Sequence, residues 1–168
     1  MNMSFFNDLN EKINLTIQMI LANQDLCKLL YYNDYSPLSQ PTIPDTSILL
    51  TNHIIPMPKG TSLVTDKTSI LNIYFFDATP YPNSGFRELH LCIDIMCHLD
   101  VWMCDGGIRP YLISSKLDNM FNNMLIPTLS NNKIFFEDWK YGRYSDLFYG
   151  YRAIYRFGTD SNVGSVCR

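Results

Sequence analysis

Apolar residues at near-helical spacing predict that the chain begins with an amphipathic helix over residues 4–22. Ser4 is suited to cap the N-terminus of this helix. The positions that share its apolar face are Phe5, Phe6, Leu9, Ile13, Ile17, Ile20 and Leu21. A second, short helix is expected to start at Gln24 or Asp25 and to stop before Asn33.

Residues 33–68 break this periodicity, because five prolines punctuate the segment. Proline removes a backbone donor and excludes a helix interior or a central strand, so we expect an extended, proline-rich arm. The arm is not polar throughout. Its apolar side chains need a cover, either from the chain's own core or from a partner subunit: Ile48, Leu49, Leu50, Ile54, Ile55 and Met57.

After residue 68 the pattern is that of strands, with one helix following a turn at Asp105, Gly106 and Gly107. Strands are expected at residues 69–77, 87–102, 132–141 and 146–157. The predicted fold class is therefore α+β, with a mixed or antiparallel sheet of about four to five strands packed on the N-terminal helix and the internal helix. We expect residues 1–168 to form a single domain, in which residues 158–168 are a flexible tail.

Composition favours a packed globular protein without a surface for nucleic acid. Hydrophobic residues make up 46% of the 168 residues, and 13 Lys and Arg stand against 16 Asp and Glu, a net charge of −3. Such a balance predicts no basic patch. The N-terminal stretch has no basic leader region and no uninterrupted apolar span, so neither a signal peptide nor a membrane helix is expected. The five cysteines include no C-x-x-C pair and are expected to be reduced thiols.

Residues 90–104, HLCIDIMCHLDVWMC, hold the densest set of candidate ligands and nucleophiles. Alternate side chains of a strand point to opposite faces. One face then carries an apolar stripe, in which Cys97 is a buried hydrophobe: Leu91, Ile93, Ile95, Cys97, Leu99 and Val101. The other face carries the polar set: His90, Cys92, Asp94, Met96, His98 and Asp100.

The polar set does not have the spacing of a zinc site, which needs four convergent ligands. Cys104 lies near a turn, but no base that would activate it is recognisable. We therefore predict no catalytic residue, no metal site and no cofactor. The alternative is a small zinc- or cysteine-dependent enzyme centred on His90, Cys92, His98 and Cys104.

The remaining motifs have simpler interpretations. The stretch CDGGIRPY lacks the glycine spacing of a nucleotide-binding loop and is interpreted as a turn into a helix. Arg109 in this stretch is a candidate to pair with a carboxylate of a neighbouring subunit. Arg152 and Arg156 lie four residues apart and are expected on a solvated strand face, opposite an aromatic one.

Four stretches resemble the small neck proteins of tailed bacteriophages, the tail-terminator and head–tail connector proteins: ILNIYFFDATP, LHLCIDIMCHLDVW, GGIRPYLISSKLDNMFNN and FYGYRAIYRF. The resemblance covers residues 26–157 and rests on the order of an N-terminal helix, an arm, strands and one internal helix. It implies a non-enzymatic virion protein of the neck or tail, assembled in the host cytoplasm. Its copies form a homo-oligomeric ring that contacts portal, connector or tail-tube proteins, with no membrane. DNA passes through the central channel without specific binding.

Closure of a ring requires that two different patches of the subunit meet. We predict one patch at Ile48, Leu49, Leu50, Ile54, Ile55 and Met57, with Arg109 as a further interface residue. Its receptor is predicted at an exposed edge around Phe135, Trp139 and Tyr141. Replacing Ile54 or Ile55 with aspartate is then expected to block assembly while the monomer stays folded. A further possibility is a small phage protein that binds one host partner.

Overall fold

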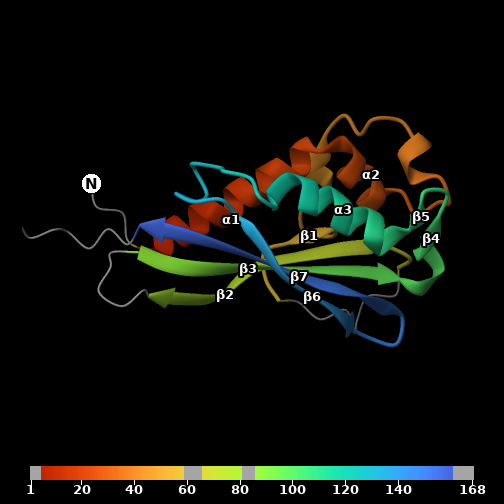
Figure 1. The fold of residues 1–168 in the computed structure, drawn as a ribbon. Coiled ribbons are helices and arrows are strands. Elements are labelled where there is room, and N and C mark those ends of the chain that lie inside the picture. The colour runs from red at the N-terminus through yellow and green to blue at the C-terminus, as the bar shows by residue number, and fades with distance from the viewer. Residues whose placement is uncertain (1–4, 59–65, 81–85, 161–168) are drawn as a thin grey trace, which may run out of the picture.

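Three α-helices lie on one face of a five-stranded sheet in the computed structural model, which describes residues 5–58, 66–80 and 86–160 (Figure 1). The helices are α1 (Phe5–Ala22), α2 (Gln24–Tyr31) and α3 (Arg109–Phe121), with short 3-10 helices η1 (Pro37–Ser39), η2 (Thr46–Leu49) and η3 (Leu99–Val101). The strands are β1 (Ile54–Ile55), β2 (Ser69–Pro80), β3 (Phe86–His98), β4 (Met103–Cys104), β5 (Gly107–Ile108), β6 (Phe135–Arg143) and β7 (Phe148–Asp160). The predicted α+β class is confirmed.

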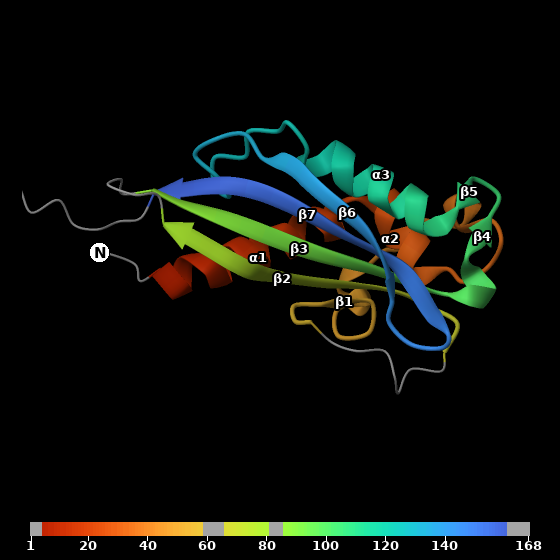
Figure 2. The same ribbon diagram turned by 60° about the horizontal axis from the view of Figure 1, so that its bottom comes forward.

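The sheet is mixed, with the strand order β1-β2-β3-β7-β6 (Figure 2). Strand β1 pairs with β2 in parallel, whereas β2, β3, β7 and β6 pair as antiparallel neighbours. Strands β4 and β5 form a separate two-stranded sheet. Consequently β1 and β6 are the two opposite edges of the main sheet.

Both N-terminal helices form where their sequences predict them. In α1, Ile17 and Ile20 are buried against the sheet, as the apolar stripe requires. Asn23 separates α1 from α2 and caps α2, because its side chain accepts a hydrogen bond from the backbone N–H of Leu26 at 3.1 Å. Ser4, the expected cap of α1, lies outside the described residues. None of the helices in the described ranges is long and apolar enough to cross a membrane.

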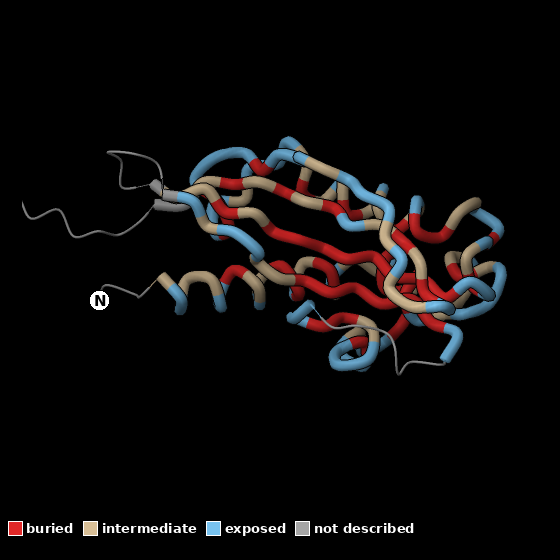
Figure 3. Tube along the Cα trace, turned by 90° about the horizontal axis from the view of Figure 1, so that it is seen from below, coloured by how far each residue is buried: buried red, intermediate tan, exposed pale blue. Residues whose placement is uncertain are grey.

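The central strands carry the core on their helix-facing side. The apolar stripe predicted for β3 is confirmed from Leu91 to Cys97, and Cys97 is fully buried. The strand ends earlier than predicted, because His98 begins a tight turn: its Nδ1 accepts the backbone N–H of Asp100 at 3.0 Å, which starts η3. Leu99 is consequently exposed and Val101 is buried from outside the strand. Figure 3 shows the buried positions gathered along the middle of the sheet.

Residues 33–58 contain only single helical turns and the short β1, and they lie against the core instead of projecting from it. Ile43, Leu49 and Ile54 belong to the main core. Of the two covers that the sequence left open for these side chains, the chain's own core is therefore the one found here. Residues 59–65 of the predicted arm lie outside the described residues. At the other end, residues 158–160 of the predicted tail belong to β7, and residues 161–168 are not described.

Arg109 joins the start of α3 to the end of α2 and the residues that follow it. Its guanidinium is fully buried and donates hydrogen bonds of 2.7–2.8 Å to the carbonyl oxygens of Val101, Leu29, Tyr32 and Asp34. Burial lowers the pKa of Arg109, but arginine stays charged in proteins. The interface role predicted for Arg109 is thus corrected: its donors are used within the chain.

Asp94 is the centre of a hydrogen-bond network on the face of the sheet that the helices leave uncovered. The carboxylate is buried and accepts a bidentate pair from Arg152, with Nε–Oδ1 at 2.7 Å and Nη2–Oδ2 at 3.2 Å. The hydroxyls of Tyr74 and Tyr144 donate to the same carboxylate at 3.0 Å each. Burial and the Asp94 charge raise the pKa of both tyrosines. Arg152 is exposed, as expected for a solvated strand face, and it is also a partner in this four-residue network, which joins β2, β3 and β7.

Candidate functional site: the two edges of the sheet

The residues of the alternative enzyme site each have their own local partners. Cys92 lies buried beside Tyr74 and Asp94, while His98 caps η3 and contacts the ring of Phe148. Cys104 lies in the separate small sheet, where its thiol contacts the carbonyl oxygen of Gly107 at 3.5 Å. In the part of the chain that the structure describes, no group of three or more His, Cys, Asp or Glu side chains is arranged to hold a metal ion.

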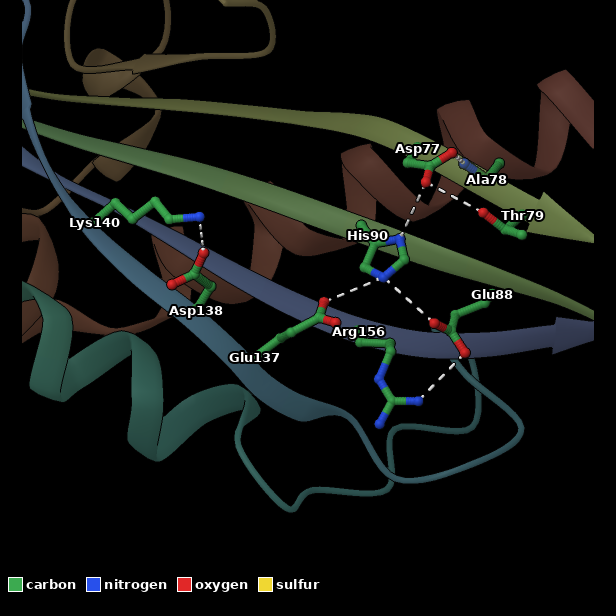
Figure 4. A network of polar contacts seen from close by, with 9 residues as sticks. All are labelled: Asp77, Ala78, Thr79, Glu88, His90, Glu137, Asp138, Lys140 and Arg156. Atoms are coloured by element: carbon green, nitrogen blue, oxygen red, sulfur yellow. Dashed lines mark hydrogen bonds and ion pairs between the residues drawn. The ribbon is translucent and has the colours of Figure 1, made fainter.

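His90 lies among carboxylates on the uncovered face of the sheet (Figure 4). Its Nε2 is 3.1 Å from an oxygen of Glu137 and 3.4 Å from one of Glu88, and its Nδ1 is 3.9 Å from Asp77. Glu137 stands at the bulge of β6, where the register to β7 shifts between Phe136 and Asp138. The network therefore ties the edge strand β6 across β7 to β3, which is a structural role.

The cysteines of the described ranges are buried and unpaired: Cys27, Cys92, Cys97 and Cys104. Burial raises the pKa of Cys27 and of Cys92 to about 11 and that of Cys97 to about 12. Because the thiolate is the nucleophile, these three thiols are unreactive near neutral pH.

This burial predicts slow thiol modification. In a Cys167→Ser variant, we expect the native protein at pH 8 to react with Ellman's reagent at least about tenfold more slowly than the same variant unfolded in urea. The absorbance of the thionitrobenzoate that the reagent releases measures both rates. One rapidly reacting thiol in the native state would contradict the prediction and favour a cysteine-dependent enzyme.

A groove of about 350 Å³ lies between α3 and the edge strand β6. It is open along β6, which pairs only with β7 among the described strands. We call it the aromatic groove; its lining residues are Tyr111, Ser114, Ser115, Asp118, Asn122, Phe136, Trp139, Ala153 and Tyr155. Asn122 fixes its end, because the side-chain oxygen accepts the backbone N–H of Phe136 at 3.1 Å.

Tyr111 and Trp139 of this groove form an ordered stack with two neighbouring tyrosines, Tyr151 and Tyr141. Trp139 lies 3.8 Å from Tyr151, centroid to centroid, with the ring planes 7° apart. The hydroxyls of Tyr111 and Tyr151 lie 3.0 Å apart, and this hydrogen bond is the main reason that the pKa of Tyr151 rises to about 12. Tyr141 packs edge-on against Tyr151 and is still 61% exposed. These rings present a rigid apolar surface to solvent.

The aromatic groove carries a negative charge that no positive charge among the described residues balances. Asp118 lines it, and among the described residues it forms no ion pair; its nearest polar contact is a 3.4 Å hydrogen bond from Asn122. The charged side chains Asp138 and Lys140 of β6 pair with each other, and they stand in register with Ile154 and Arg152, on the opposite face of the sheet from Trp139. The groove thus offers aromatic rings and one unmatched negative charge.

The opposite edge carries a second, different apolar surface. A groove of about 650 Å³ lies between α1 and residues 50–57. We call the outward part of this region the β1 edge surface, made by Leu50, Pro56, Met57 and Pro58, which are all exposed, Met57 by 52%. Thr51 beside it has a φ of 74°, a strained value for a β-branched residue. Backbone strain of this kind is often found at functional sites.

The predicted interface residues divide into two groups. Those that reach the surface are Ile48, Leu50, Met57, Phe135, Trp139 and Tyr141. Leu49, Ile54 and Ile55 are buried in the chain, as is Arg109, so these four are withdrawn as contacts to a neighbour. Leu49 and Ile54 belong to the main core, whereas Ile55 packs in a smaller cluster with Ile70, Met96 and Phe148.

Aspartate at position 54 is therefore expected to unfold the chain, contrary to the expectation from sequence. Ile54 is 0% exposed, so Ile54→Asp places a charge in the core and lowers the free energy of unfolding by about 4 kcal/mol or more. Met57→Asp changes it little, because Met57 projects into solvent. Urea unfolding followed by circular dichroism measures both. Equal stabilities of the two variants would contradict the burial of Ile54.

The chain matches the YomW family model over residues 23–157. This chain belongs to the YomW family. The matched range contains α2, the β1 edge surface, α3, β6 and nearly all of β7, so both edge surfaces fall within it. YomW is a phage-type family, in agreement with a phage protein. No curated protein matches the chain.

Trp139 is the only lining residue of the aromatic groove that was singled out from the sequence of this YomW-family chain; Tyr111, Asp118 and the other lining residues were not. A signal for the first two exists, because Tyr111, Ser115, Asp118 and Asn122 recur at helical spacing on the face of α3 that the core does not use. Their meeting with β6 depends on the position of β6 at the sheet edge, and spacing alone does not contain that information.

Proposed function

We propose that this YomW-family protein is a structural protein of the neck of a tailed-phage virion. Its copies associate head to tail into a closed ring that joins the head to the tail and caps tail-tube assembly. The observation that carries the proposal is the pair of unlike apolar surfaces on the two opposite edges of one sheet. The phage-type family and the resemblance to neck proteins support it.

Unlike surfaces favour a ring over a symmetric dimer. A twofold dimer buries the same patch on both subunits, which would leave the other edge uncovered. Head-to-tail contacts between the aromatic groove and the β1 edge surface cover both, and they close when the rotation per subunit divides a full turn. Exposed aromatic residues and methionine are typical of such interfaces.

The charge balance fits a conduit for DNA. With a net charge of −3, the subunit has no excess of the basic side chains that would release counterions from DNA and hold it. DNA then passes through the channel without specific binding. The proposed partners are further copies of the chain and the portal, connector or tail-tube proteins of the same virion. The proposal assigns no catalytic residue, metal or cofactor to the chain.

The mass of the native assembly tests this proposal. Light scattering after size exclusion, over a hundredfold range of loading concentration, is expected to show a discrete multimer at high concentration, and negative-stain images of that peak are expected to show rings. Denatured protein run in urea is the monomer standard. A chain that remains monomeric at every concentration, and also in the presence of purified tail tubes, would overturn the proposal.

A further inference from the structure

We infer that the β6 strands of two copies pair edge to edge and antiparallel, with Trp139 of one copy opposite Trp139 of the other. The pairing joins two five-stranded sheets into one, with the helices of both copies on the same face. The inference goes beyond the proposed function, since it concerns the free subunit before a ring is built. It commits to a second copy of this chain as the partner of the edge.

Strand β6 is an open edge of the sheet. Among the described strands it pairs only with β7, and most of its nine residues are exposed (Figure 2). The exposed side chains include the rings of Trp139 and Tyr141. A long edge strand that carries apolar side chains is a template for pairing with another strand. A free subunit is therefore expected to cover this edge.

The backbone of β6 directs alternate N–H groups away from β7. The N–H of Tyr144 donates to the carbonyl oxygen of Phe148 at 3.0 Å, so Tyr144 belongs to the set that points inward. The N–H of Trp139 donates at 2.9 Å to the side chain of Asp138 and not to β7. Because neighbouring N–H groups of a strand point to opposite sides, those of Trp139 and Tyr141 point outward. Two β6 strands can then exchange a reciprocal pair of hydrogen bonds at Trp139.

Charge complementarity selects a second copy and the register of the pairing. With Trp139 opposite itself, Asp138 of each copy stands opposite Lys140 of the other, so two ion pairs form across the contact. These two side chains also pair within one copy (Figure 4), so the four charges alternate in sign. A pairing centred on Lys140 would oppose two lysines, which is unfavourable. One centred on Tyr141 would place Lys140 opposite Gly142, without an ion pair.

This dimer and the proposed ring exclude each other within one subunit. Trp139 also lines the aromatic groove, so its ring serves one of the two contacts at a time. The dimer leaves the β1 edge surface uncovered and does not replace the ring. A subunit therefore leaves the dimer before it enters a ring, and until then the dimer protects the β6 edge from pairing with unrelated strands.

Two charge-reversal variants test the pairing. Lys140→Asp places aspartates opposite aspartates in the dimer, and Asp138→Lys places lysines opposite lysines. Each variant alone is expected to dimerise at least about tenfold more weakly than wild type. An equimolar mixture of the two is expected to dimerise about as strongly as wild type, because the lysines of one variant then face the aspartates of the other. Sedimentation velocity, at concentrations below those at which rings form, measures the dissociation constants.

Two further variants serve as controls. Combining Asp138→Lys with Lys140→Asp in one chain exchanges the charges and keeps opposite signs across the contact, so this double variant is expected to dimerise like wild type. Lys67 is exposed and pairs with Asp100 outside β6, and Lys67→Asp is likewise expected to leave the dimer unchanged. Circular dichroism confirms that each variant is folded.

The outcomes separate the inference from the proposed function. If wild type forms rings but no dimer at lower concentration, or if the mixture associates as weakly as its two components, the inference is overturned and the ring stands. If wild type dimerises with the expected response to the charge variants but never assembles further, even with purified tail tubes, the inference stands and the proposed function fails. Wild type that stays monomeric at every concentration overturns the inference.

Discussion

Replacing Arg109 with alanine is expected to lower the free energy of unfolding by about 3–5 kcal/mol. The side chain is fully buried and donates to four backbone carbonyls, three of them in residues 29–34. Without the guanidinium those carbonyls are left without their donor in a cavity the size of an arginine, and each such group costs about 1–3 kcal/mol. Urea unfolding at pH 7, followed by circular dichroism, measures the loss.

Two further arginine variants define this effect. Arg109→Lys is expected to recover only part of the stability, because an ammonium group cannot reach four carbonyls in the planar arrangement of a guanidinium. Arg143→Ala is the control: that side chain is exposed and pairs with Asp146 on the surface, so its loss is expected to leave the unfolding transition unchanged. A change of less than about 1 kcal/mol in Arg109→Ala would contradict the burial described here.

Gly150→Ala is expected to destabilise the protein by about 3 kcal/mol or more, through a steric clash in the centre of the sheet. A methyl group on Gly150 would stand 1.8 Å from the carbonyl oxygen of Ile95 and 3.3 Å from the Cα of Met96. Both atoms belong to the backbone of β3, so the pairing of β3 with β7 would have to shift. Thermal and urea unfolding both report the loss.

Gly142 is the matched control, because it stands opposite Gly150 on β6. The nearest atoms to a methyl group there belong to the side chain of Tyr144, at 3.1 Å, and a side chain can move where a backbone cannot. Gly142→Ala is therefore expected to change stability far less than Gly150→Ala. If the two substitutions had the same effect, the close approach of Gly150 to β3 would be wrong.

Periodic segments were predictable because their partners impose a simple rule on them. The apolar stripe of α1 packs against one surface, and so does the alternating set Leu91, Ile93 and Ile95. Spacing alone therefore indicates each element and its buried face. The end of β3 was not predictable in this way. The side chain of His98 captures a backbone N–H two residues on, and that local hydrogen bond overrides a pattern that continues through Val101.

The position of residues 33–58 was harder to predict. Prolines exclude certain backbone conformations, but they do not indicate where in the fold a segment lies. Its apolar content called for a cover, and Leu49 and Ile54 found it in the core of their own chain. Arg109 shows the same difficulty. An arginine in a sequence suggests an ionic partner. Here Arg109 instead donates hydrogen bonds to backbone carbonyls, which become its neighbours only when α2 and α3 pack together.

The candidate site was partly predictable for a related reason. Phe135, Trp139 and Tyr141 are too apolar for a solvated strand, which indicated an exposed edge before the strand order was known. The polar wall of the groove comes from α3. Asp118 in this helix could not be predicted as a binding residue, because nothing in the sequence links it to β6.

Directional cross-linking tests the central claim, head-to-tail association through the two edges, most directly. A chain with Met57→Cys, Ser115→Cys and Cys167→Ser carries one new exposed thiol on each edge, while its native thiols in the described ranges stay buried. Treatment with a short bis-maleimide is expected to give a ladder of covalent multimers on a denaturing gel, and either single-cysteine variant is expected to stay monomeric. A double variant that yields no species above a dimer would contradict the claim.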